Sequence, residues 1–353
     1  MSKFQTVGGL VFLALFLIAG CGSQESTADE AAAIERPVVV ATTTILGDVL
    51  SNLAAQQFDV VTIMPPGTDP HLFQPSAQDI AAIESASAVI ANGALFEEGL
   101  LDALNAAEDD GALVFEAITA VDQLEASGST HDHEDGHDDD HHVDDEDHDE
   151  HADDAHGDED EHGDDGEHDA HGNEGALDPH FFTDPARMAV AVNGIADFLI
   201  ANVDTLNAEK LTAAAEEYIE VLTALDREVE TTLASIPESG RVLITNHQVF
   251  SYFADRYDFE VIGTVIPVGS TDDGVSGRRL VELSELLESE GVSVVFADIS
   301  SSDELAQTLA NEVGDVAVVK LYTESLGEPG SSGATYVEMI RNNALEIASG
   351  LGE

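Results

Sequence analysis

The histidines of this chain fall into two groups, and both could bind a metal ion. The sequence contains 14 histidines. Eleven lie in one acidic segment, and three lie outside it in the short contexts DPHLFQP, DPHFFTDP and TNHQVFSYF. These three are His71, His180 and His247. Because imidazole is the commonest protein ligand for zinc-like ions, this distribution indicates metal handling.

The acidic segment is interpreted as a low-affinity collecting surface for metal ions. Its histidines are His131, His133, His137, His141, His142, His148, His151, His156, His162, His168 and His171. The same stretch carries 22 of the 72 acidic residues of the chain and no lysine or arginine. It has almost nothing to bury, so residues 127–174 are predicted to be an insertion that is disordered without metal.

Two sets of short apolar runs predict an α/β fold with two parallel sheets. The first set covers 37–44, 58–64, 87–93 and 112–117, and the second covers 241–246, 259–266, 292–298 and 316–321. Between them lie stretches rich in alanine, leucine and glutamate. Near-continuous apolar strands that alternate with helices are typical of parallel sheets covered on both faces. We therefore expect two similar lobes with four parallel strands each.

A long helical pattern separates the two sets of strands. Its apolar residues recur at spacings of three and four: Leu211, Ala215, Tyr218, Leu222, Leu225, Val229 and Leu233. An earlier helix is expected over 186–201. The predicted organisation is an N-terminal lobe over 37–205, a linker helix over 206–236 and a C-terminal lobe over 237–353. A helix packed within one domain is the alternative reading.

Two of the three isolated histidines follow predicted strands, where sites of open parallel sheets form. His247 comes directly after the run 241–246, His71 follows 58–64, and His180 follows the insertion. Glu324 follows the last run and supplies a fourth candidate ligand, with Asp298 ranked below it. Three imidazoles and one carboxylate suit four-coordinate Zn²⁺ between the lobes.

Two aspartates precede the first two histidines in repeated Asp-Pro-His triplets. Asp69 and Asp178 are expected either to orient an imidazole or to serve as turn residues. A ligand imidazole must be neutral, so metal capture should weaken below about pH 6. The rival interpretation, a secreted zinc enzyme, is disfavoured because the sequence has no HExxH pattern and no obvious general base near the histidines.

Several segments together resemble the metal-binding lipoproteins of zinc and manganese ABC importers, the cluster A-I solute-binding proteins. The segments are TTTILGDVL, GTDPHLFQPSAQDI, NGALFEEGL, LDPHFFTDP, TNHQVFSYFADRYDF, VVFADISSS, and LYTESLG with TYVEMIRNN. The resemblance covers residues 37–345 and is closest to the zinc-uptake members that carry a His-rich loop. It implies two α/β lobes joined by one long rigid helix, with the metal buried between them and no enzymatic activity.

The resemblance also assigns ligands by position. His71, His180 and His247 match the ligand positions, and Glu324 stands where many relatives have an aspartate, so water could replace it. Manganese-preferring relatives tend to place a second carboxylate at the third histidine, so His247 points to zinc, with manganese less favoured. The alternatives are a manganese or iron protein of the same family, and a surface-anchored metal buffer or adhesin without a transporter.

The N-terminus has the pattern of a bacterial lipoprotein signal over 1–20. Cys21, the single cysteine, would carry the lipid, and 21–36 would be a flexible tether to the outer face of the cytoplasmic membrane. The net charge of −61 argues against nucleic acid and against electrostatic binding to anionic lipid. We therefore expect a protein held at the membrane through its lipid alone. The resemblance implies that its partners are a permease and its ATPase, and we expect a monomer.

Overall fold

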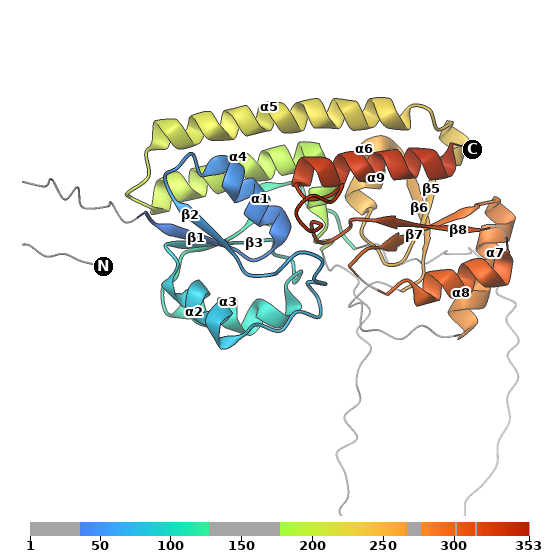
Figure 1. Cartoon of the computed structure of the whole chain (residues 1–353), viewed down its shortest axis with the longest axis horizontal. Coiled ribbons are helices and arrows are strands. Elements are labelled where there is room, and N and C mark those ends of the chain that lie inside the picture. The colour runs from blue at the N-terminus through green and yellow to red at the C-terminus, as the bar shows by residue number, and fades with distance from the viewer. Residues whose placement is uncertain (1–35, 127–176, 267–276, 301, 315, 353) are drawn as a thin grey trace, which may run out of the picture. The chain divides into compact units, whose positions relative to one another are not determined.

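Within the residues that the structure describes, eight short strands form two parallel sheets of the same topology (Figure 1). The computed structural model describes residues 36–126, 177–266, 277–300, 302–314 and 316–352. The first sheet has the order β2-β1-β3-β4 and the second β6-β5-β7-β8. The strands are β1 Val38–Ala41, β2 Asp59–Thr62, β3 Ala88–Ala91, β4 Val114–Glu116, β5 Val242–Thr245, β6 Glu260–Thr264, β7 Val294–Asp298 and β8 Ala317–Leu321. Each predicted run contains one strand, which confirms the predicted two-lobed α/β class.

Helices connect the strands and cover both faces of each sheet. The α-helices are α1 Thr44–Leu53, α2 Ala77–Ser85, α3 Leu101–Asp109, α4 Pro185–Asn202, α5 Ala208–Leu233, α6 Ser251–Tyr257, α7 Gly277–Glu290, α8 Glu304–Val313 and α9 Tyr336–Leu351. Short 3-10 turns are η1 Glu98–Leu100, η2 Ala117–Ala120, η3 Phe181–Thr183 and η4 Glu238–Gly240. None of the described helices is long and apolar enough to cross a membrane.

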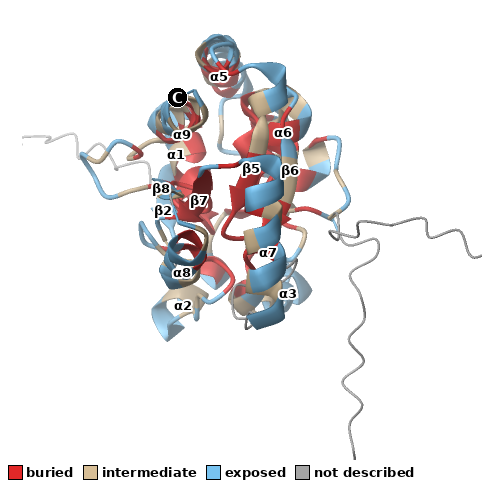
Figure 2. Cartoon of the chain, turned by 90° about the vertical axis from the view of Figure 1, so that its right-hand side faces the viewer, coloured by how far each residue is buried: buried red, intermediate tan, exposed pale blue. Residues whose placement is uncertain are grey.

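The inner strands β1, β3, β5 and β7 are almost entirely apolar because both of their faces are buried. Successive side chains of a strand point to opposite faces. In β7, Val294 and Phe296 join one hydrophobic cluster, whereas Val295 and Ala297 join another beneath α7 and α8. Figure 2 shows buried residues gathered on β5 and β7, with exposed residues on α7. This burial explains why the sequence pattern of these strands is continuous rather than alternating.

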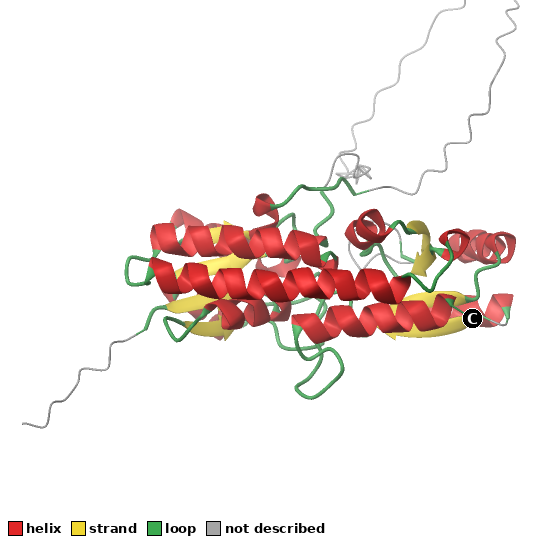
Figure 3. Cartoon of the chain, turned by 90° about the horizontal axis from the view of Figure 1, so that it is seen from above, coloured by secondary structure: helices red, strands yellow, loops and turns green. Residues whose placement is uncertain are grey.

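The 26-residue helix α5 spans about 39 Å and contacts helices attached to both sheets. Asn207 caps its first turn by accepting a hydrogen bond from the Lys210 amide at 2.9 Å. All seven residues of the predicted apolar stripe are buried. Figures 1 and 3 show α5 lying beside α4 and α9, which it contacts most extensively among the helices. The predicted joining of the lobes by one long helix is confirmed.

One hydrophobic cluster runs through both lobes. It includes Val39 of β1 and Ile45 of α1, Leu222 of α5, and Phe296 of β7 with Ile347 of α9. The lobes therefore share a core along α5, which opposes wide hinge motion. The predicted signal, the lipidated Cys21 and the His-rich insertion lie outside the described residues. The boundaries 37–205, 206–236 and 237–353 stay predictions.

Candidate metal centre

His71 lies on the loop after β2 and is contacted by three carboxylates. Its backbone amide donates to Asp69 Oδ1 at 2.9 Å, which fixes the turn. Its ring Nδ1 lies 3.2 Å from Glu98 Oε1, and its Nε2 lies 2.9 Å from Glu324 Oε1. Asp69 thus acts on the turn, whereas Glu98 faces the imidazole.

His180 immediately precedes η3, which leads into α4. Asp178 Oδ1 accepts from the His180 amide at 2.9 Å and lies 2.7 Å from its Nδ1. The Nε2 of His180 lies 3.2 Å from Glu324 Oε1. Asp178 therefore serves both as a turn residue and as the group that orients the ring, which combines the two roles expected from the sequence.

His247 and Glu324 follow two strands of the second sheet. His247 stands two residues after β5, where the Thr245 hydroxyl donates to its carbonyl at 2.8 Å. Glu324 stands three residues after β8. Between the strand and Glu324, the side chain of Asn343 on α9 accepts a hydrogen bond from the Tyr322 amide and donates one to the Tyr322 carbonyl. The His247 Nε2 lies 2.8 Å from Glu324 Oε1. Strand ends therefore place both donors at one edge of the sheet, as predicted.

The four donors meet at one buried point between the lobes. Their potential ligand atoms all lie within 4.8 Å of one another. The side chains are nearly inaccessible, with residue exposures of 8 % for His71, 4 % for His180, 3 % for His247 and 1 % for Glu324. The three imidazole nitrogens lie 2.8–3.2 Å from Glu324 Oε1. These separations are somewhat shorter than the roughly 3.3 Å between tetrahedral ligand atoms that Zn–N distances of about 2.0–2.1 Å imply.

The electrostatics of the centre also fit a cation. Burial lowers the pKa of His180, but Asp178 and then Glu324 outweigh it and raise the pKa from 6.5 to about 9. Burial raises the pKa of Glu324, yet the imidazoles, His247 foremost, hold it well below its usual 4.5. The pKa of His71 is also raised, because Glu324 outweighs burial. Within the described part of the chain, Glu324 Oε2 is buried without a hydrogen-bond partner, as expected of a spare ligand atom.

Asp298, the competing fourth ligand, lies beside the centre but outside the donor group. It is 1 % exposed and accepts hydrogen bonds from the amide and hydroxyl of Ser300 at 2.9 and 2.5 Å. Burial and then the charge of Glu324 raise its pKa. The structure therefore brings Glu324, rather than Asp298, to the three imidazoles.

The sequence reasoning missed the groups that position the loops of the first lobe. Buried Glu97 accepts from the Thr42 hydroxyl at 2.5 Å and from the Asn92 amide at 2.6 Å. The Asn92 side chain in turn donates to the carbonyl of Pro179 at 2.9 Å, next to His180. Two consecutive acids shortly after the run 87–93 were the available signal.

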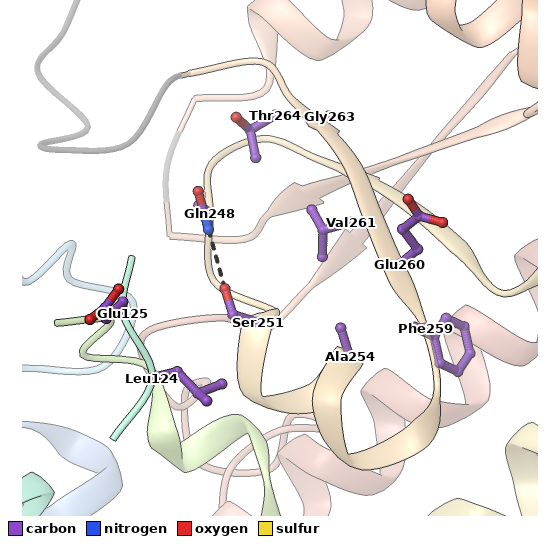
Figure 4. Close-up of a pocket in the computed structure, with 10 residues that line it drawn as sticks. All are labelled: Leu124, Glu125, Gln248, Ser251, Ala254, Phe259, Glu260, Val261, Gly263 and Thr264. Atoms are coloured by element: carbon purple, nitrogen blue, oxygen red, sulfur yellow. Dashed lines mark hydrogen bonds between the residues drawn. The ribbon is translucent and has the colours of Figure 1, made fainter. Parts of the chain in front are cut away.

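A separate pocket lies against α6, close to the centre in sequence but lined by other residues (Figure 4). It is lined by Leu124, Glu125, Gln248, Ser251, Ala254, Phe259, Glu260, Val261, Gly263 and Thr264. Gln248 follows His247 directly, and its side chain donates to Ser251 at 3.3 Å across the pocket wall. None of the four donors lines this pocket, which is consistent with a closed centre.

The fold and the centre together define a two-lobed protein with a buried set of candidate ligands for a divalent metal ion, and the known proteins that it resembles are of the same class. Residues 39–350 match the family described as "Zinc-uptake complex component A periplasmic". The manganese-binding lipoprotein MntA of Bacillus subtilis is 27 % identical over 355 residues, covering 98 % of this chain and 99 % of that protein. The protein of the same name from Halalkalibacterium halodurans is 25 % identical over 346 residues, covering 98 % and 97 %.

A solved structure supports the fold. The periplasmic zinc-binding protein TroA from Treponema pallidum superposes with a TM-score of 0.69 at 22 % identity, covering 90 % of this chain and all of that one. The chain belongs to the zinc-uptake complex component A family of metal ABC importers. It is therefore a metal-binding component of a transporter of this class and not an enzyme.

Proposed function

We propose that this protein captures Zn²⁺ outside the cytoplasm and delivers it to the permease of an ABC importer. The observation that carries this proposal is the convergence of three imidazole nitrogens on one buried carboxylate oxygen. Such an N₃O set suits tetrahedral zinc, whereas manganese generally takes more oxygen ligands in octahedral geometry. All four donors are buried, so the centre resembles a closed binding site rather than a catalytic one.

The proposed cycle begins at the membrane. Lipid on Cys21 would hold the protein at the outer face of the cytoplasmic membrane, and the His-rich segment would collect ions weakly. Both assignments rest on sequence, because these residues lie outside the described part. The buried centre would then bind one ion tightly, and the loaded monomer would dock on a permease that works with an ATPase.

Manganese transport is the second candidate function. The observation in its favour is that the two relatives at 25 and 27 % identity are both named manganese-binding. We expect the imidazole at position 247 to disfavour it, because a third nitrogen donor replaces an oxygen that Mn²⁺ prefers.

Ion competition combined with uptake by cells separates these candidates: competition sets a minimum requirement, because nitrogen and oxygen ligands generally bind Zn²⁺ more tightly than Mn²⁺, and a comparison of zinc and manganese uptake in a deletion strain decides which ion is transported. Protein stripped of metal is titrated with Zn²⁺ and Mn²⁺ against a calibrated chelator, and we expect Zn²⁺ to bind at least about a hundredfold more tightly, as the ligand chemistry suggests. Equal affinities, or tighter Mn²⁺ binding, would contradict zinc selectivity. Unchanged zinc uptake by a deletion strain in zinc-poor medium would contradict transport and favour a surface buffer.

A further inference from the structure

Arg187 lies at the junction between α4 and α6 and contacts both elements. Arg187, in the first turn of α4, donates from Nη1 to Asp184 at 2.9 Å and from Nη2 to Asp255 of α6 at 2.7 Å. Its guanidinium carbon also lies 4.9 Å from the ring centre of Tyr252 on α6. Tyr252 and Asp255 are three residues apart and share one face of that helix.

Both elements lead directly to metal donors. Helix α4 follows His180 through η3, and α6 follows His247 after three residues. The Tyr252 hydroxyl donates to the carbonyl of Asp178 at 2.9 Å, and the carboxylate of Asp178 orients His180. Arg187 thus joins the segment that carries one imidazole to the segment that carries another.

The charges at this junction depend on the arginine. A second arginine, Arg256 of α6, pairs with Asp226 of α5 at 2.5 Å and lies 4.0 Å from Asp184. Loss of Arg187 would remove the ion pair of Asp255 and would leave Asp184 beside the guanidinium of Arg256, which already pairs with Asp226. With 11 basic against 72 acidic residues in the chain, few cations could compensate. The interaction across the junction would change from attraction towards repulsion.

We infer that Arg187 is a positioning residue, a latch between the lobes that keeps His180 and His247 in register and slows release of the bound ion. This inference rests on the proposed function in taking Zn²⁺ as the ion. The planar guanidinium donates to Asp184 and Asp255 in two directions and also stacks on Tyr252. The ammonium group of a lysine cannot reproduce this geometry. The Asp255 side chain is 53 % exposed, so salt reaches the latch and weakens it.

Zinc release measured by stopped flow with an excess of fluorescent chelator tests the latch. We expect Arg187→Gln to accelerate release at least about tenfold, Arg187→Lys to lie between it and the wild type, and high salt to accelerate the wild type more than the glutamine variant. Arg187→Gln combined with Asp255→Asn should release zinc more slowly than Arg187→Gln alone, because one repelling carboxylate is removed.

Arg341→Gln is the matched control, because Arg341 forms a comparable two-armed pair with Glu228 between α9 and α5, away from the centre. It should lower the thermal midpoint without changing zinc release by more than about twofold, as expected for an exposed pair. Equal release from wild type and Arg187→Gln, or equal acceleration by the control, would overturn the latch. If Arg187→Gln does not fold, zinc release from Arg187→Lys is compared with release from the wild type, and equal rates would overturn the latch. Weak zinc binding by the wild type would instead overturn the proposed function.

Discussion

Zinc affinity should depend on pH far above the range in which an ordinary histidine titrates. Both ring nitrogens of His180 face carboxylate oxygens, at 2.7 and 3.2 Å, so both must donate and the ring carries a proton that zinc has to displace. With a pKa of about 9, that proton makes the apparent affinity rise about tenfold per pH unit from pH 6 to 8, or roughly a hundredfold in all. A histidine at 6.5 would give only about fourfold.

The assay is zinc competition at each pH against a chelator of known pH dependence. The raised pKa of His71 should steepen the curve further. Asp178→Asn is the diagnostic variant, because it removes the main group that raises the pKa of His180. It should flatten the curve while costing about ten- to a hundredfold in affinity at pH 8 through loss of ring orientation. A rise of fourfold or less in the wild type between pH 6 and 8 would refute the reasoning.

Stability should change with pH in the opposite direction. Because the folded-state pKa of His180 lies above its unfolded value, this group stabilises protein stripped of metal fully below about pH 6.5. That contribution is lost as the pH rises through about 9. The lowered pKa of Glu324 contributes above about pH 4.5 and is lost in stronger acid. The sequence-based expectation that capture weakens below about pH 6 therefore moves upward by more than two units.

Three other perturbations test the centre, the insertion and the core. His180→Ala should weaken zinc binding by more than about a hundredfold in chelator competition, since a direct donor should matter more than a supporting group; an unchanged dissociation constant would contradict its role. Deleting 131–171 should leave one tight zinc ion by mass spectrometry and fewer weak ones; loss of folding would contradict an insertion. Leu222→Ala should cost about 2–5 kcal/mol in urea unfolding, whereas exposed Val221→Ala should change stability by less than about 0.5 kcal/mol.

The fold was predictable because the pattern of apolar residues along the sequence follows the burial of each strand and helix. Residues such as Val294 to Ala297 are apolar at every position since helices cover both faces of the sheet. The stripe on α5 recurs with the helical period because only one side of that helix is buried. Asp226 broke this rule: it lies on the buried side, where Arg256 and Tyr257 of α6 satisfy its carboxylate. A pairing across 30 residues has no local signature.

The candidate ligands were predictable for a related reason, whereas not all of the residues that position them were. His71, His247 and Glu324 follow strands, and parallel topology brings strand ends to one edge. Asp178 was recognisable as a neighbour of His180. Glu98 was not recognisable as a neighbour of His71, because their contact depends on Gly99 packing closely against the backbone of Phe73. A Cβ at position 99 would lie 1.9 Å from the carbonyl oxygen of Phe73. Close approach between two loops is a tertiary property.

Release of the ion must reconcile a closed centre with lobes that share a core. Wide separation would expose the cluster that runs from Val39 through Leu222 to Phe296, at a cost of roughly 25 cal/mol for each Å² of apolar surface. The contacts of α4 with α6 are instead partly polar: Asp184, Arg187, Asp255 and Arg256 line one open hollow, although Asp184 and the Tyr252 ring that Arg187 faces are buried. Ion pairs of this kind break at a smaller cost than a hydrophobic core. A small displacement of α6 relative to α4 would separate His247 from His180 without parting the two sheets, although it would also strain the bonds of Arg256 and Tyr257 to Asp226 of α5. We therefore expect release to begin at this junction.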